Sequence, residues 1–111
     1  MFRLFVSWLI FLCSWGSISS WAQSRQTVTI TIKDHRFNPS PLIAPAGEKF
    51  QMKVDNQDPT PEEFESYDLN REKVVNGNKS IIVFLGPLVK GTYKYFGDFH
   101  QKTAQGVIIA Q

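Results

Sequence analysis

Cysteine is nearly absent from this chain of 111 residues, which contains one, Cys13. The bulky pair Phe11 and Leu12 precedes it, whereas a lipidation site would have small residues there. From residue 23 onward the sequence has no cysteine, so this part can form no disulfide and offer no thiolate to a metal. A domain without those supports is expected to rely on a well-packed β core.

Histidine and net charge are scarce as well. The chain has two histidines, His35 and His100, and 12 basic against 10 acidic residues. So small a net charge favours neither nucleic acid nor an anionic membrane as a partner. Seven acids and one base, Arg71, lie between Asp55 and Glu72. This clustering favours a cation or a basic partner, with a solvated loop as the alternative.

Catalytic motifs are also missing. The sequence contains neither Gly-x-Ser-x-Gly nor a glycine-rich phosphate loop, and no cysteine nucleophile follows residue 22. A non-catalytic binding or redox-partner protein is therefore expected rather than an enzyme.

The N-terminal segment predicts export. Arg3 precedes an apolar stretch, Leu4 to Leu12, and Ser20-Trp21-Ala22 fits a small-x-small cleavage site. Residues 1–22 are thus predicted to be a signal peptide, and residues 23–111 one periplasmic domain with no membrane span. The apolar stretch is short for a span, although an uncleaved anchor is the alternative.

The rest of the chain alternates between short strands and turns. Apolar and polar residues alternate in TVTITIK (27–33) and FQMKVDN (50–56), the period-two pattern of strands. SIIVFLG (80–86) is a nearly continuous apolar run, typical of a central strand. Shorter strands are expected at 42–44, 63–66, 92–96 and 107–110. About seven or eight strands separated by proline and glycine turns predict an all-β Greek-key sandwich.

Two long segments resemble the halves of a cupredoxin domain. IKDHRFNPSPLIAPAGEKFQMKVDNQD (32–58) is similar to the first half, and GPLVKGTYKYFGDFHQKTAQGVIIA (86–110) to the second. TPEEFES (60–66) and REKVVNGN (71–78) resemble the EfeO-type cupredoxin-like domains. That resemblance implies a small periplasmic component of a bacterial iron or metal uptake system, with periplasmic or inner-membrane uptake proteins as partners.

The resemblance also shows which copper ligands are missing. Aligned on His100 and Gly106, the Cys-x-x-His-x-x-x-Met-x-Gly loop of many cupredoxins puts Gly97 in place of cysteine and Ala104 in place of methionine. The first histidine of such sites is missing too, and Glu63 falls near its position. A type 1 copper centre is therefore not expected.

Oxygen and nitrogen donors are predicted to take over this role. Glu63 and Glu65 share one face of an extended segment while Phe64 points into the core, and Asp98 and His100 are likewise two residues apart. The candidate ligands are His100, Glu63, His35, Asp98, Glu65 and Glu72. Such a set suits Cu(II), Fe(II/III), Mn(II) or Zn(II), with copper or iron as the expected cofactor. Each of these residues also has an ordinary structural role as an alternative, as a loop cap or a surface charge.

Three functions fit these observations. The first is a metal-binding protein that serves iron or copper uptake or oxidation together with a membrane permease. The second is a β-sandwich interaction module that binds no metal and docks a partner through its acidic patch. The third is a periplasmic copper carrier.

Overall fold

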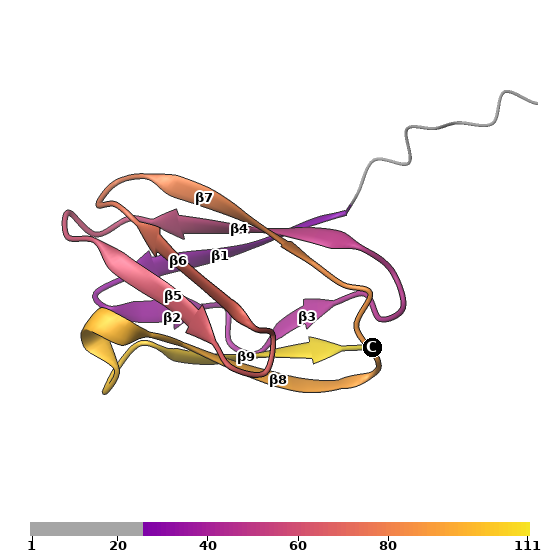
Figure 1. The fold of residues 1–111 in the computed structure, drawn as a ribbon. Helices are drawn as coiled ribbons and strands as arrows, with labels where there is room; N and C mark the ends of the chain where they lie inside the picture. Colours follow the sequence, from indigo (N-terminus) through magenta and orange to yellow (C-terminus); the bar gives the residue numbers. More distant parts are fainter. Residues whose placement is uncertain (1–25) are drawn as a thin grey trace, which may run out of the picture.

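The computed structural model describes residues 26–111, and the predicted signal peptide, residues 1–22, lies outside this range. The described residues form nine β-strands in two sheets and one 3₁₀ turn (Figure 1). The first sheet has the order β2-β1-β4-β7, from Arg36–Asn38, Thr27–Lys33, Phe50–Asn56 and Ser80–Leu85. The second has the order β3-β9-β8-β5-β6, from Leu42–Ala44, Gln105–Ala110, Gly91–Gly97, Glu62–Ser66 and Arg71–Val75. This arrangement confirms the prediction of an all-β sandwich.

Two of the nine strands were not expected from the sequence. β2 has three residues, and β6 is exposed at four of its five positions. Neither strand therefore has the alternating apolar pattern by which the longer strands are recognised. Val74 and Val75 end β6, and the turn to β7 follows at Gly77 and Asn78.

The alternation in the longer strands places their apolar residues in the core. Ile30 and Ile32 on β1 are buried, as are Met52 and Val54 on β4. The two strands are parallel, with Val28 opposite Met52 and Ile32 opposite Asn56. Met52 is fully buried among apolar side chains and packs as a core residue.

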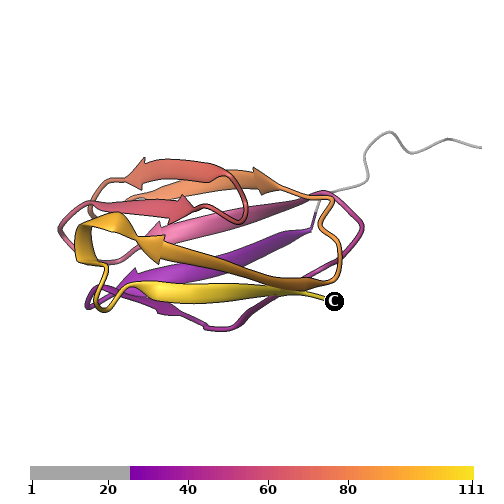
Figure 2. The ribbon, with the colours of Figure 1, turned by 60° about the horizontal axis from the view of Figure 1, so that its bottom comes forward.

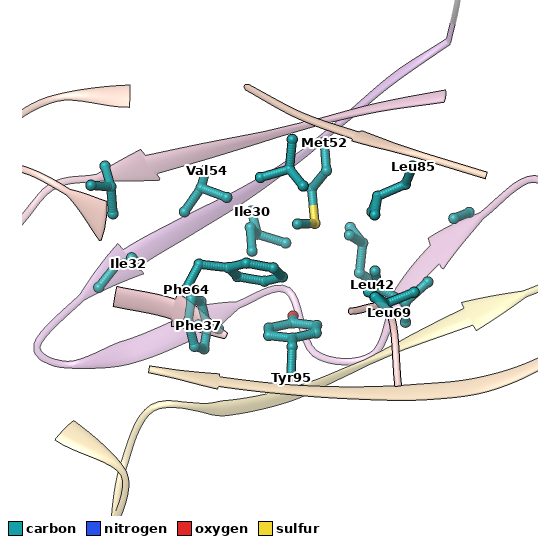
Figure 3. Packing of buried hydrophobic residues seen from close by; sticks show 14 of the residues in the cluster. Ile30, Ile32, Phe37, Leu42, Met52, Val54, Phe64, Leu69, Leu85 and Tyr95 are labelled. Carbon is teal, nitrogen blue, oxygen red and sulfur yellow. The ribbon is translucent and has the colours of Figure 1, made fainter. Parts of the chain in front are cut away.

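Three aromatic rings join the two sheets beneath one end of the sandwich (Figure 3). The ring centroid of Tyr95 on β8 lies 5.0 Å from Phe37 on β2 and 5.3 Å from Phe64 on β5. Burial of one such ring stabilises the fold by about 2 kcal/mol. The packing of Phe64 also fixes which face of β5 points inward. Side chains two residues apart share a face, so Glu62 and Ser66 are buried with it.

Tyr95 also depends on the glycine opposite it. A Cβ at Gly106 would lie 2.5 Å from the hydroxyl of Tyr95, so only glycine lets the ring lie against β9. Burial raises the pKa of the Tyr95 phenol. Its hydroxyl is buried and makes no hydrogen bond within the described residues.

The Tyr95→Phe protein is expected to be more stable than the wild type by about 1 kcal/mol, because a buried polar group without a partner costs free energy. Urea unfolding followed by circular dichroism measures the difference. A loss of more than about 1 kcal/mol would show instead that the hydroxyl makes a stabilising hydrogen bond.

The connecting turns gather at the two ends of the sandwich, as Figure 2 shows. The turn between β1 and β2 and the 3₁₀ turn η1, Asp98–His100, lie at the same end. Within residues 26–111 no helix is long and apolar enough to cross a membrane. The end of the sandwich that carries η1 also carries both histidines, and the candidate site is built there.

Candidate metal centre

His35 reaches the site from a tight two-residue turn. Lys33 on β1 pairs with Arg36 on β2, so Asp34 and His35 alone connect the strands. Their φ angles are 52° and 56°. Positive φ at both central positions is the conformation of a type I′ hairpin turn, which Asn-Gly normally fills. The turn thus places an imidazole where a hairpin usually has no side chain.

Asp58 holds this turn from the loop that follows β4. Its Oδ1 accepts the backbone N–H of Asp34 at 2.8 Å, and its Oδ2 accepts that of His35 at 3.0 Å. The same Oδ2 lies 3.5 Å from Nδ1 of His35. Burial raises the pKa of Asp58, but the backbone hydrogen bonds and the nearby imidazoles of His35 and His100 outweigh it and lower the pKa below its usual value. Asp58 is therefore a negative charge beneath the turn.

The side chain of Asn56 holds the backbone of Asp58 in place. The Oδ1 of Asn56 accepts the backbone N–H of Asp58 at 3.0 Å. Its Nδ2 donates to the carbonyl of Thr60 at 2.8 Å, and the carbonyls of Val75 and Asn76 each lie 3.3 Å from it. The amide is 1% exposed, and this buried network joins the end of β4 to β5 and β6.

Glu62 begins β5 and is the most deeply buried carboxylate of the site, at 1% exposure. Its Oε1 accepts the backbone N–H of Phe99 at 2.8 Å and that of Glu63 at 3.1 Å. Its Oε2 lies 2.5 Å from Nδ1 of His100. Because an ionised carboxylate only accepts, the Nδ1 of His100 donates this short bond. Three donors thus compensate for the burial of the charge.

Gly97 makes room for Glu62. A Cβ at Gly97 would lie 2.6 Å from Cδ of Glu62 and 2.7 Å from Cβ of Ala104. The backbone of the loop closes on itself, since Gly97 N–H donates to Ala104 and Ala104 N–H donates to His100, both at 2.8 Å. The loop therefore packs closely against the carboxylate of Glu62.

The two histidines meet above these carboxylates. The rings of His35 and His100 are stacked, with centroids 3.6 Å apart and planes inclined by 14°. One ligand atom each from His35, Glu62 and His100 lies within 4.8 Å of the others. The side chains of His35 and His100 are 41% and 30% exposed. The group is thus open on the imidazole side and closed on the carboxylate side.

The structure brings together two of the six predicted ligands, His35 and His100. Their carboxylate neighbour is Glu62, which sequence reasoning missed, whereas Glu63 points to the other face of β5. The sequence did contain a signal for Glu62, because this residue lies two positions before Phe64 and therefore points to the same inward face of β5. The carboxylate of Asp98, although next in the loop, accepts a hydrogen bond from Gln101 at 2.7 Å.

The three other predicted ligands form a second group on the outer face of the sheet. Glu65 lies opposite Glu72 on β6, and Glu63 lies two pairs further along, opposite Val74. One oxygen each from Glu63, Glu65 and Glu72 lies within 4.8 Å of the others. The hydrogen bond that Glu63 donates to Glu72, desolvation and the charges of Glu72, Asp98 and Glu65 raise the pKa of Glu63 to about 7. Desolvation, together with the charges of Glu72 and Asp98, also raises the pKa of Glu65.

This acidic group predicts a loss of stability with rising pH. The pKa of Glu63 is raised from 4.5 to about 7 in the folded protein, so folding disfavours its ionised form. The penalty is absent below pH 4.5 and grows as pH rises toward about 7. The Glu63→Gln protein should therefore gain thermal stability relative to the wild type across this range, measured as the difference in Tm. Glu48→Gln, at an exposed glutamate elsewhere, is the control. A Glu63→Gln difference that is constant with pH would contradict the raised pKa.

Comparison with known proteins places this arrangement in a family. A family model described as a cupredoxin-like domain matches residues 3–110. The chain belongs to the cupredoxin-like domain family. An uncharacterized protein of Rickettsia prowazekii (strain Madrid E) is 54% identical over 82 residues, which make up 74% of this chain and 66% of that protein. The chain therefore spans slightly less than two thirds of that relative.

Solved structures of cupredoxins have the same fold. Auracyanin A, a "blue" copper protein of Chloroflexus aurantiacus, is 16% identical with a TM-score of 0.66, over 77% of this chain and 98% of that one. The metal-binding domain of the Cu(I)-exporting ATPase CopA of Streptococcus pneumoniae D39 is 12% identical with a TM-score of 0.70, over 83% and 91%. A purple cupredoxin of Nitrosopumilus maritimus is 19% identical with a TM-score of 0.58, over 78% and 99%. At these identities the likeness concerns the fold alone.

The residues of this chain do not fit a type 1 copper centre. Such a centre needs a cysteine thiolate beside two imidazoles, and residues 26–111 contain no cysteine. Ala104, at the expected methionine position, is fully buried. The donors at this end of the sandwich are two imidazoles and a carboxylate, which fit a metal site of nitrogen and oxygen ligands.

Proposed function

We propose that this protein is an exported metal-binding protein that holds one transition-metal ion with His35, His100 and Glu62. The observation that carries the proposal is the convergence of the only two histidines of the chain on a buried, fully hydrogen-bonded carboxylate. The histidines are 65 positions apart in the sequence, and the fold stacks their rings. Imidazole and carboxylate are common ligands of divalent transition metals.

Copper is the preferred ion in this proposal. For a given set of nitrogen and oxygen ligands, Cu(II) binds more tightly than the other divalent first-row ions. The family relationship supports the same choice, since auracyanin A and the CopA domain are copper proteins by name. Bound copper would supply one-electron redox chemistry, while the chain's own residues bind and orient the ion. Iron is the alternative ion.

One ring must turn for both imidazoles to bind the same ion. A nitrogen lone pair lies in the plane of its ring, and planes inclined by 14° with centroids 3.6 Å apart do not meet near the rings. His100 is held at 2.5 Å by Glu62, whereas Nδ1 of His35 lies 3.5 Å from Asp58 and its ring is the more exposed. His35 is therefore the ring that turns.

The copper-loaded protein should lack the intense visible absorption of a copper–thiolate bond, because no cysteine is available beyond residue 22. Absorption spectroscopy and electron paramagnetic resonance of the Cu(II)-loaded protein test this prediction. A strongly blue protein with the narrow copper hyperfine splitting of a type 1 centre would contradict the proposed nitrogen and oxygen site.

A role in metal uptake follows from the resemblance to EfeO-type domains. In that role the protein is periplasmic and transfers or oxidises iron, or carries copper, together with a membrane permease. The support is the sequence similarity at 60–66 and 71–78 together with the N-terminal segment. A pull-down from a membrane extract, followed by mass spectrometry, tests for the partner: recovery of a metal permease supports this role, and its absence contradicts it.

The second candidate function is an interaction module that binds no metal. The observation that favours it is the group formed by Glu63, Glu65 and Glu72, which crowds negative charge on one outer face. Calorimetric titration with Cu(II), Fe(III), Zn(II) and Mn(II) separates the two candidates. Binding of one ion per chain supports the metal site, and no binding of any ion supports the interaction module.

A further inference from the structure

The turn that carries His35 is strained. Asp34 and His35 both have φ near +55°, at 52° and 56°. A residue with a Cβ in this region costs roughly 1–2 kcal/mol relative to right-handed backbone, and glycine avoids the cost. A hairpin selected for stability alone would therefore have Gly at position 35. Histidine there indicates that the imidazole has a function that outweighs the strain.

Asp58 is placed to compensate for this strain. Its two oxygens accept the backbone N–H groups of Asp34 and His35, so both strained residues are bound by one carboxylate. Asp58 itself is 7% exposed and is fixed by the buried Asn56. The contact joins the turn between β1 and β2 to the loop that follows β4.

We propose that Asp58 is the positioning residue of the metal centre, which holds the strained Asp34–His35 turn so that the His35 imidazole meets His100 and Glu62. This inference rests on the proposed function. Asp58 fixes the backbone through two short hydrogen bonds and leaves the ring, at 3.5 Å, free to turn toward an ion. Asp58 lies outside the group of His35, Glu62 and His100, whose ligand atoms lie within 4.8 Å of one another.

A double-mutant cycle tests the proposal on the full folded domain, with wild type, Asp58→Asn, His35→Gly and the double variant. Asparagine is nearly the same shape but has one acceptor oxygen, so it can bind only one of the two N–H groups. Asp58→Asn should weaken Cu(II) binding about ten-fold, the usual effect of losing a residue that orients a ligand. In the double variant, Asp58→Asn should cause no loss of Cu(II) affinity beyond that caused by His35→Gly, because there is no imidazole left to position.

Two further readouts separate positioning from a general loss of stability. The electron paramagnetic resonance spectrum of Cu(II)-loaded Asp58→Asn should show coupling to one fewer nitrogen than the wild type. His35→Gly should raise the Tm by about 4 °C, because it removes left-handed strain, and Asp58→Asn should lower the Tm less in that background. Asp68 is the matched control, since its carboxylate also accepts a backbone N–H, that of Lys94, on β8. Asp68→Asn should leave Cu(II) affinity unchanged.

The outcomes separate this inference from the proposed function. A wild type that binds no Cu(II) overturns both. A wild type that binds Cu(II), with Asp58→Asn equal to it or with the same loss in both backgrounds, overturns the positioning role alone. Where Asp58→Asn by itself does not fold, the double variant decides. Folding of the double variant supports the role at the turn, and its failure to fold overturns that role.

Discussion

The His100→Ala protein should bind Cu(II) at least ten-fold more weakly than the wild type, a loss of about 1.4 kcal/mol. His100 offers the more firmly oriented of the two imidazoles, because Glu62 holds its ring at 2.5 Å. A carboxylate partner on the second ring nitrogen is the usual way in which metal-binding histidines are fixed. Isothermal titration calorimetry at neutral pH measures the affinity, and the Cu(II) resonance spectrum should lose one nitrogen coupling.

Lys102→Ala provides the control in the same loop. Lys102 is exposed and lies outside the group of His35, Glu62 and His100, so its removal should leave the affinity unchanged. The Tm of both variants must be measured, because His100→Ala also removes one donor from the buried Glu62. A folded His100→Ala protein that binds Cu(II) and Fe(III) as tightly as the wild type would show that His100 is a loop residue. The interaction module would then be the better description.

The fold could be predicted where the sequence alternates strictly. Ile30 and Ile32 occupy inward positions of β1, and Met52 and Val54 those of β4, as their spacing indicates. Prediction failed for β6, where Arg71, Glu72 and Lys73 face solvent at the edge of the sheet. An edge strand paired on one side can form without an apolar face, so its sequence does not distinguish it from a loop.

The candidate site could be predicted in part. The resemblance of the loop at 95–106 singled out His100 as a candidate, and the position of His35 after the first strand suggested that it reaches the same end, where the two rings are stacked. The choice of Glu63 rather than Glu62 selected the outward face of β5. Successive side chains of a strand point to opposite faces, so when Phe64 points inward, Glu62 points inward with it and Glu63 points outward. A charged residue on a core face was not expected, because such residues are rarely buried without partners.

The partners that make burial of Glu62 possible could not be seen in the sequence. Two of its three donors are backbone N–H groups, one of them from Phe99, which lies 37 positions further along the chain. Backbone groups carry no residue-specific signal, and their direction depends on the course of η1. The same holds for Asp58, which acts through the backbone of Asp34 and His35 over 24 and 23 positions.

The neighbours Glu62 and Glu63 allow a decisive comparison, because the same substitution at each tests opposite faces of β5. Glu62→Gln should weaken Cu(II) binding ten-fold or more, because the substitution removes a negative charge. That charge orients His100 and would balance the positive charge of the bound ion. Glu63→Gln should leave Cu(II) affinity nearly unchanged, because its carboxylate belongs to the group with Glu65 and Glu72. The sequence-based choice of Glu63 as the ligand predicts the reverse order.

Substitutions at Glu62 and Glu63 should also differ in their effect on the stability of the fold. Glu62→Ala leaves the N–H of Phe99 without its acceptor and His100 without its partner, and the loss of these hydrogen bonds to a charged group costs about 3 kcal/mol. Glu62→Gln keeps one acceptor oxygen and should cost about 1 kcal/mol. Urea unfolding at pH 7 measures both, with Glu63→Ala as the control, which relieves crowded charge and should not destabilise the fold. A Glu62→Ala protein as stable as the wild type would mean that the buried carboxylate is not held by the bonds described. Equal Cu(II) affinities for Glu62→Gln and the wild type would remove Glu62 from the metal centre.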